Sequence, residues 1–339
     1  MSGRALRWLL SLGVRAPRPN EGSPRLTIVR QHRIYRAQEQ PLYRLGVSEA
    51  LFDAQVAACV ATGLTPMTVQ AGLDWLANAK SGHRLAFSFD DGYADNVTLA
   101  VPILVKHGAK GTFYLAAGLM DEQRAPWWDE LAWCLTEAAH KPVSLSLGGQ
   151  SVTLDLASWP GQRAALRALL PMLRVPPAEQ RARLDALREG TGVRTAAPCA
   201  LAPWSLAQRF AEAGMEVGAH TLTHPFLSLI PPAEQTREIV GSAAMIRERL
   251  RAPVTGLAYP NGDHDAHTIA ATNRSGLAYA VTTLAGDCTH VRAPFEVPRR
   301  ALTEGACLAP GARFSAHMLR AELTGAFDHL RRDRAEAGT

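Results

Sequence analysis

Short apolar runs alternate along the chain with longer segments in which apolar residues recur at helical spacing. In residues 48–63, Leu51, Phe52 and Val56 follow this spacing behind Ser48, whose hydroxyl can cap a helix. A second helix is predicted over 96–105, and strands are predicted over 26–29, 85–89, 111–116, 217–219, 257–259, 280–283 and 297–302. This alternation predicts an α/β fold with a parallel sheet or barrel, in which reactive groups lie where strands end.

Residues 121–203 break the alternation. A hairpin is predicted over 143–154, and helices are predicted over 127–139, 160–173 and 177–188. We interpret the segment as a mainly helical insertion or lid between elements of the barrel. At its start, Trp127 and Trp128 either stack on sugar rings or pack inside the helical cap, and the sequence leaves both alternatives open.

The two ends of the chain differ from the part between them. Residues 1–24 are an N-terminal segment and linker, in which Arg4 and Arg7 precede an apolar stretch too short to span a bilayer. That stretch is either an interfacial helix that contacts the membrane or a frayed terminus. Residues 303–339 are predicted to form a helical tail with a single amphipathic helix over 313–332.

Composition narrows the choice of partner and compartment. A hydrophobic content of 47% and a charged content of 20% are those of a globular protein, and the net charge of +5 includes no basic run. We therefore expect no nucleic-acid partner, whereas the surplus of arginine over lysine favours an acidic or phosphate-linked substrate. The five cysteines include no CxxC pair, which predicts free thiols and a cytoplasmic location, with peripheral contact at the inner membrane left open.

Two short segments about 130 residues apart carry the candidate chemistry. Asp90 and Asp91 directly follow a predicted strand, and His220 and His224 follow another. Either segment alone is weak evidence, because Asp-Asp-Gly also builds turns and a histidine pair can be structural. Together they offer one carboxylate and two imidazoles, the ligand set of a divalent ion with open positions, and a spare carboxylate that can accept a proton from water. The pattern predicts a metal-dependent hydrolase.

These motifs resemble those of the polysaccharide deacetylases, carbohydrate esterase family four. The family motif T-F-D-D-G is similar to residues 88–92, H-[ST]-x-x-H is met by residues 220–224, and a Y-H-x-V signature is similar to residues 28–34. The resemblance covers roughly residues 26–302, so we take 25–302 as the catalytic domain. It implies a distorted (β/α) barrel and removal of N-acetyl groups from amino sugars.

The resemblance also implies roles for individual residues. Asp91, His220 and His224 are the implied ligands of a divalent metal, with zinc preferred, and Asp90 is the implied general base. The third family motif, R-x-P-Y-G, is only partly present in residues 258–262, where its arginine is absent.

That departure affects two catalytic groups. Asn261 replaces the motif tyrosine, and its backbone N–H can still donate to the oxyanion. Arg299 is our candidate for the missing positive charge that orients Asp90. Tyr259, Pro260, His32 and Trp128 are the predicted substrate-binding residues.

The family's general acid, a histidine in an L-x-x-H motif, has no clear counterpart. His317 has the spacing but lies in the predicted tail helix, and His32, His264 and His267 are the other candidates.

The expected function is removal of an N-acetyl or N-formyl group from an amino sugar of a cell-envelope glycan or its lipid-linked precursor. The alternative is a catalytically impaired carbohydrate-binding or assembly protein on the same scaffold. The missing arginine and acid favour that alternative, and the intact Asp90 opposes it.

Overall fold

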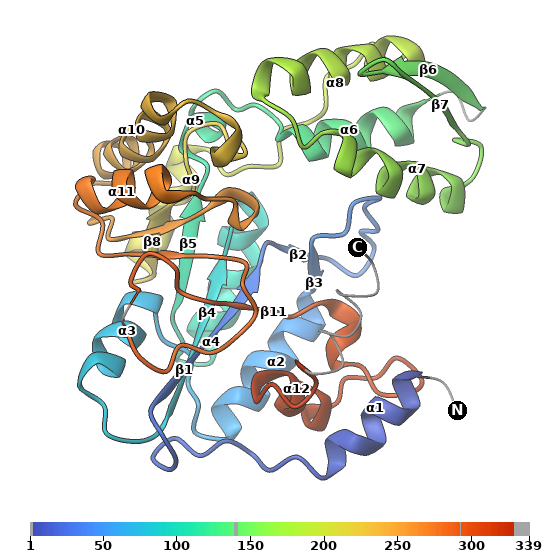
Figure 1. Cartoon of the computed structure of the whole chain (residues 1–339). Helices are drawn as coiled ribbons and strands as arrows, with labels where there is room; N and C mark the ends of the chain where they lie inside the picture. The colour runs from blue at the N-terminus through green and yellow to red at the C-terminus, as the bar shows by residue number, and fades with distance from the viewer. Residues whose placement is uncertain (1–2, 139–141, 292, 329–339) are drawn as a thin grey trace.

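A seven-stranded parallel sheet runs through the part of the chain that the computed structural model describes, residues 3–138, 142–291 and 293–328 (Figure 1). In order across the sheet its strands are β10 (Tyr279–Val281), β9 (Gly256–Ala258), β8 (Glu216–Ala219), β5 (Gly111–Leu115), β4 (His83–Phe89), β1 (Arg25–Gln31) and β11 (Arg300–Ala301). Each strand lies within or overlaps a run that the sequence predicts, so the expected parallel α/β architecture is confirmed.

The segment between β10 and β11 links the two edges of the sheet into a distorted barrel. Val297 forms a parallel bridge with Val281, and Cys288 forms an antiparallel bridge with Leu26. The predicted strand 297–302 is correct only at β11, because Pro298 has no backbone N–H to donate to a neighbouring strand. The barrel is therefore irregular at the closure where Arg299 lies.

Helices cover the outer face of the sheet. They are α2 (Glu49–Ala61), α4 (Val101–Lys106), α5 (Ala117–Asp121), α9 (Trp204–Glu212), α10 (Pro232–Leu250) and α11 (Ala266–Arg274). The exception is α3 (Val69–Asn78), which packs against the opposite face through Val69, Leu73 and Leu76. The short helical turns are η1 (Asn96–Ala100), η2 (Leu227–Leu229), η3 (Pro260–Gly262) and η4 (Glu304–Cys307). On the outer face, Phe89 stacks on Phe113, and Phe113 on Phe210. The opposite face of the strands packs in a separate cluster that includes Ile28 and Tyr114. Side chains on β1 alternate between the two clusters, as a strand with both faces buried requires.

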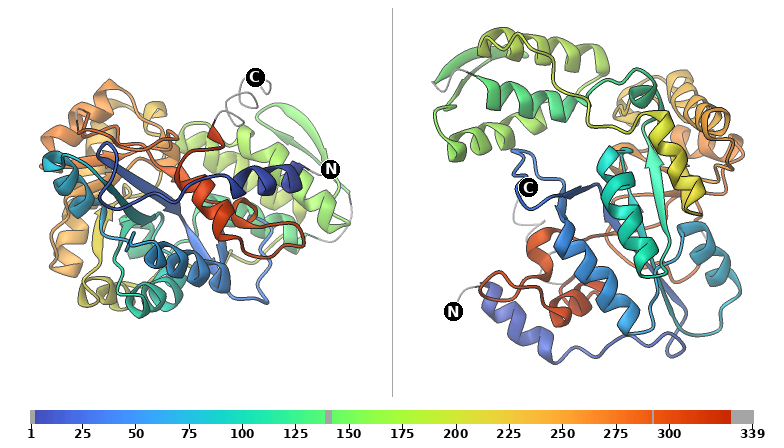
Figure 2. Two further views of the ribbon diagram at one scale, coloured as in Figure 1. Left: turned by 90° about the horizontal axis from the view of Figure 1, so that it is seen from below. Right: turned by 180° about the vertical axis from the view of Figure 1, so that it is seen from behind.

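The insertion stands beside the barrel as a helical unit with its own core (Figure 2). It comprises α6 (Trp127–Glu137), the hairpin of β6 (Val143–Leu147) and β7 (Gln150–Leu154), α7 (Trp159–Met172) and α8 (Pro177–Thr191). Its elements agree with the prediction, although residue 139 at the end of the first predicted helix lies outside the described residues. Leu42, from the segment between β2 (Arg33–Tyr35) and β3 (Gly46–Ser48), joins the core of the insertion to the barrel.

The N-terminal segment is folded, so the frayed-terminus alternative is wrong. Helix α1 (Gly3–Leu12) lies beside α12 (Ala316–Leu323) (Figures 1 and 2). Arg7 of α1 pairs with Glu322 of α12. The predicted single tail helix is also wrong, since α12 ends before Gly325, whose φ of 72° is outside the helical region. Residues 329–332 of that prediction lie outside the described part. The five cysteines are free, and among the described helices none is long and apolar enough to cross a membrane.

Candidate metal centre and active site

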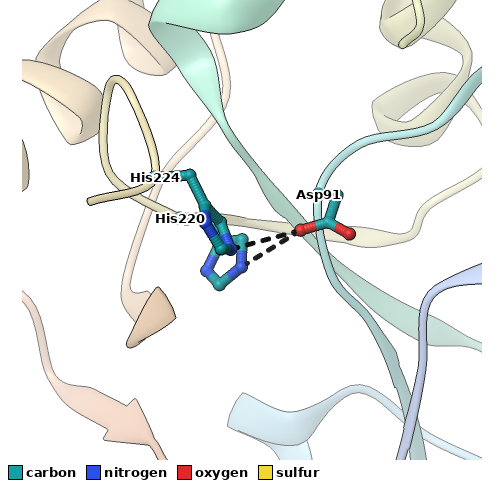
Figure 3. A group of neighbouring side chains, drawn as sticks. All are labelled: Asp91, His220 and His224. Carbon is teal, nitrogen blue, oxygen red and sulfur yellow. Dashed lines mark ion pairs between the residues drawn. The ribbon is translucent and has the colours of Figure 1, made fainter. Parts of the chain in front are cut away.

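Three side chains converge at the ends of β4 and β8 (Figure 3). The Oδ1 atom of Asp91 lies 3.4 Å from Nε2 of His220 and 3.6 Å from Nε2 of His224. The ligand atoms of the three residues all lie within 4.8 Å of one another, and all three side chains are buried. The two segments predicted from sequence thus meet in one cluster of metal-ligating groups.

The chemistry of this cluster fits a divalent metal ion. Neither carboxylate oxygen of Asp91 has a hydrogen-bond partner among the described residues, although both are buried. A buried carboxylate without donors is unfavourable unless a cation compensates its charge. The Nδ1 atom of His220 lies 2.7 Å from the carbonyl oxygen of Ala258, which directs Nε2 toward Asp91. One carboxylate and two imidazoles of this kind suit zinc.

Unusual backbone conformations place these ligands. Asp91, Thr221, His224 and Asn261 have φ values between 55° and 78°, and they are four of the seven non-glycine residues with positive φ in the described chain. Each such residue costs of the order of 1 kcal/mol or more, so their concentration here is typical of a functional site.

The loop that carries the two histidines is held from below by Glu238 of α10. Its carboxylate accepts hydrogen bonds from the backbone N–H groups of Leu222 and Thr223 and from the Thr223 hydroxyl. The Thr221 hydroxyl also accepts from the backbone N–H of His224. These bonds compensate the strained turn and fix the separation of the imidazoles.

Asp90 lies beside the cluster in a bidentate ion pair. The guanidinium of Arg299 donates to Oδ1 at 2.7 Å and to Oδ2 at 2.8 Å, and it also donates to Ser88 Oγ and to the Thr282 carbonyl. Burial alone would raise the pKa of Asp90, but the charge and hydrogen bonds of Arg299 hold it well below its usual value. Asp90 is therefore a carboxylate at neutral pH, and the residue paired with it is Arg299, our sequence-based candidate for the charge that orients it.

The cluster opens into a cavity of about 440 Å³. Its lining residues are Arg30, His32, Tyr43, Leu45, Asp90, Asp91, Trp127, Trp128, Leu170, Pro171, Arg174, His220, His224, Phe226, Asn261 and Thr283. Barrel loops form its floor, and the insertion provides one wall.

Two of the predicted substrate-binding residues line this cavity. His32 follows β1, and its carbonyl accepts a hydrogen bond from Asn96. Trp128 is buried, with its indole N–H donated to the Tyr93 hydroxyl and its ring packed against His224 at a centroid distance of 4.3 Å. The indole thus supports a predicted metal ligand as well as forming part of the wall.

The other two predicted substrate-binding residues do not reach the cavity. Tyr259 and Pro260 are buried and do not line the cavity. Tyr259 instead stacks on His264 at a centroid distance of 4.8 Å, because its place at the end of β9 directs it away from the cavity. Of the candidate acids, His264, His267 and His317 also lie outside the lining, which leaves His32.

Several cavity residues were not predicted from sequence. Tyr43, Arg174, Phe226 and Thr283 belong to no motif, and their proximity depends on the folded arrangement of distant segments. Arg30 lies in the segment similar to the Y-H-x-V signature, but it was assigned no role there. Arg30 alone carried a signal, because a charged residue in the apolar run of a buried strand is unusual.

Comparison with known proteins identifies the family. Residues 77–280, more than half of the chain, match the family model described as polysaccharide deacetylase. The chain therefore belongs to the polysaccharide deacetylase family, whose activity is hydrolysis of carbohydrate amides. No curated protein matches the sequence.

Solved structures share the fold. The Streptococcus pyogenes deacetylase PplD, solved with acetate, is 19% identical with a TM-score of 0.57, over 86% of this chain and 97% of PplD. IcaB from Ammonifex degensii is 17% identical with a TM-score of 0.55, over 89% and 98%. The deacetylase domain of BpsB from Bordetella bronchiseptica is 16% identical with a TM-score of 0.52, over 85% and 98%. At these identities the similarity establishes the fold alone.

Proposed function

We propose that this chain is a metal-dependent hydrolase that removes an N-acetyl or N-formyl group from an amino sugar of a cell-envelope glycan or its lipid-linked precursor. The observation that carries the proposal is the convergence of Asp91, His220 and His224 on one cavity, with the ionised Asp90 beside them. Membership in the polysaccharide deacetylase family supports an amide of a sugar as the substrate.

Asp91, His220 and His224 would hold the metal, for which zinc is the best match. When bound there, a divalent ion would supply Lewis acidity for the amide carbonyl and would make water more acidic. Asp90 acts as the general base that takes the proton from the attacking water, and Arg299 keeps its carboxylate oriented. The backbone N–H of Asn261 donates to the developing oxyanion.

The leaving amine needs a proton, and His32 is our candidate donor. Its ring lines the cavity, and Asn96 fixes its backbone. Burial lowers the pKa of His32, while the nearby Asp91 and Asp90 carboxylates oppose that shift. A lowered pKa makes the protonated imidazole a stronger acid but leaves less of it protonated at neutral pH, so the charge of the two carboxylates favours the form that can donate. We expect His32→Gln to reduce kcat about 100-fold without loss of metal, and an unchanged kcat would exclude this role.

A decisive experiment measures acetate or formate released from N-acylated amino sugars by wild type and Asp90→Asn. Loss of turnover in Asp90→Asn with unchanged glycan binding supports the enzyme, because the variant keeps the ligands but lacks a base. Asp74→Asn is the matched control, since Asp74 is exposed on α3. Binding without any turnover by the metal-loaded wild type would instead favour a binding or assembly protein.

The proposed setting is the cytoplasmic face of the inner membrane, with α1 in contact with anionic lipid. Leu6, Leu9, Leu10 and Leu12 of this helix are exposed, and Arg4 lies on the same helix. An apolar face with basic residues suits an interfacial helix on an anionic bilayer.

This contact is tested by flotation with vesicles that contain or lack phosphatidylglycerol. Leu9→Ser with Leu10→Ser should abolish binding, and Val240→Ser, an exposed apolar residue on α10, should not. Binding that survives the double substitution would contradict the proposal.

A further inference from the structure

Arg30 is exceptional among the arginines of the described chain. Every other arginine that is buried or half-buried there has a hydrogen bond or ion pair, whereas the half-buried guanidinium of Arg30 has neither. Asp90 and Asp91 attract it at longer range, but Asp90 is already paired with Arg299. A half-buried cation without a partner lowers the stability of the fold, and such a cost is typical of a residue that binds a ligand.

The position of Arg30 connects two hollows. On β1 its neighbours across the sheet are Ser88 of β4 and Ala301 of β11. It lines the cavity that contains the candidate metal ligands, and it also lines a second hollow of about 380 Å³. His32 and Leu45 are shared in the same way, so the two hollows adjoin. A substrate whose amide lies at the metal ligands can extend past Arg30 into the second hollow.

The second hollow has an excess of positive charge. Arg30, Arg44 and Arg163 line it, and Glu304, its one acidic lining residue in the described chain, is paired with Arg44 at 2.5 Å. Arg163 comes from α7, so the insertion contributes to this side as well. Burial and the nearby Arg299 lower the pKa of Arg30, which remains a cation at neutral pH. An anion here would meet Arg30 and Arg163, two arginines that have no other partner among the residues that the structure describes.

We propose that this second hollow, which Arg30 joins to the cavity of the metal ligands, is a subsite for a phosphate group carried by the amino-sugar substrate. The planar guanidinium donates two parallel hydrogen bonds to phosphate oxygens, and the phosphate's charge matches Arg30 and Arg163 together. The inference rests on the proposed function and narrows its substrate class to phosphorylated amino sugars. A soluble sugar phosphate and a lipid-linked sugar share this chemistry.

The first test compares an N-acetylhexosamine 1-phosphate with its neutral methyl glycoside as substrates of the metal-loaded enzyme. Wild type should prefer the phosphate by about 10- to 100-fold in kcat/KM, the effect of one or two charge-assisted hydrogen bonds. Arg30→Met should lower that preference at least about tenfold, and Arg163→Ala should lower it by a few fold. Arg167→Ala is the matched control, because Arg167 is exposed on the same helix and lies outside both hollows. A preference that survives Arg30→Met would overturn the proposal.

The second test does not depend on turnover. Inorganic phosphate should bind the metal-loaded wild type in calorimetric titrations and bind Arg30→Met at least about tenfold more weakly. The melting temperature of Arg30→Met should rise, because removal of an unpaired half-buried cation removes its desolvation cost. A lower melting temperature together with unchanged phosphate binding would assign Arg30 a structural role.

These measurements separate failure of the subsite from failure of the proposed function. Arg30-dependent phosphate binding without acyl release from either substrate would remove the hydrolase and retain the subsite. Acyl release from both substrates at equal rates, without phosphate binding, would support the hydrolase and reject the phosphate subsite. A third substrate, a prenyl-phosphate-linked N-acetylhexosamine, shows whether the phosphate belongs to a lipid-linked or a soluble sugar. Faster turnover of this substrate than of the soluble 1-phosphate would indicate a lipid-linked substrate.

Discussion

The floor and the insertion-derived wall of the cavity are held in place to different degrees. On the floor, Asp90, Asp91, His220 and His224 lie on loops that follow strands of the sheet, and each is no more than 5% exposed. On the wall, Arg174 has a side chain that is 52% exposed and is joined to the floor by an ion pair with Asp263. Fixed geometry suits bond cleavage. The exposed part of the wall packs on a separate core and, unlike Trp128, does not contact a metal-ligand candidate, so it can differ without disturbing the floor. We therefore expect floor substitutions to act on kcat and wall substitutions to act mainly on KM.

The largest expected effect is on the floor. His220→Ala combined with His224→Ala should reduce metal content from about one ion per chain to none and turnover to background, because only Asp91 remains as a ligand. Elemental mass spectrometry of the purified proteins measures the content. His267→Ala is the control, since His267 is exposed on α11. Metal retained by the double variant, or absent from wild type after reconstitution with zinc, cobalt or nickel, would refute this site.

A second prediction concerns the opposite end of β4, where His83 is buried against the Thr27 hydroxyl. Burial lowers the pKa of His83 to about 4, against an ordinary value of about 6.5. Between these values the unfolded chain binds a proton that the folded chain does not, so stability is lost as pH falls. By pH 5 this group should cost about 2 kcal/mol of unfolding free energy.

Denaturant unfolding of wild type and His83→Gln at pH 7 and pH 5 measures this cost. The variant should lose less stability on acidification than wild type, and any loss of metal at low pH is common to both proteins. Equal losses would show that His83 does not control the acid response. We expect the carboxyl end of β4 to carry the chemistry and its other end to contribute to stability, and equal losses would contradict that expectation.

The wall should give a smaller and different effect. Trp127 lines the cavity beside Phe226, and its exchange for alanine should raise KM about tenfold with a smaller change in kcat, because it removes apolar contact area from the substrate. Initial rates over a range of substrate concentrations separate the two constants. Trp159→Ala is the control, since Trp159 is exposed at the start of α7. A loss confined to kcat would show that the wall takes part in the floor's geometry.

The floor was also easier to predict from sequence than the wall. Adjacent carboxylates and paired histidines are local patterns, and the rule that chemistry lies at strand ends brings them together without a three-dimensional structure. Arg174 reaches the cavity only through the placement of the insertion, which no local pattern records. Arg30 is unusual in a buried strand, but that local signal does not indicate which cavity the residue lines. Tyr259 was misplaced for a related reason, because the side to which a strand-end residue points depends on a register that the motif does not specify.

The smallest expected effect tests whether the insertion can unfold locally while the barrel stays folded. Glu130 of α6 is nearly buried and pairs with Arg181 and Arg188 of α8. Burial would raise the pKa of Glu130, but Arg181 and Arg188 lower it. Both arginines are partly exposed, so Glu130→Gln should reduce the unfolding free energy of the insertion by only about 1 kcal/mol. Native-state hydrogen exchange should show faster exchange in α6 and α8, with the barrel strands and the metal content unchanged.

The matched control is Asp185→Asn, which removes a surface partner of Arg181 and should change exchange by less than about 0.5 kcal/mol. Faster exchange confined to the insertion in Glu130→Gln would mean that the wall opens without the floor, so that it can select substrates while the metal ligands stay in place. Equal acceleration in β4 and β8 would instead mean that the two regions unfold together. The floor and the wall would then differ only in solvent exposure and not in local stability. Substitutions in the wall would also impair the catalytic geometry of the floor.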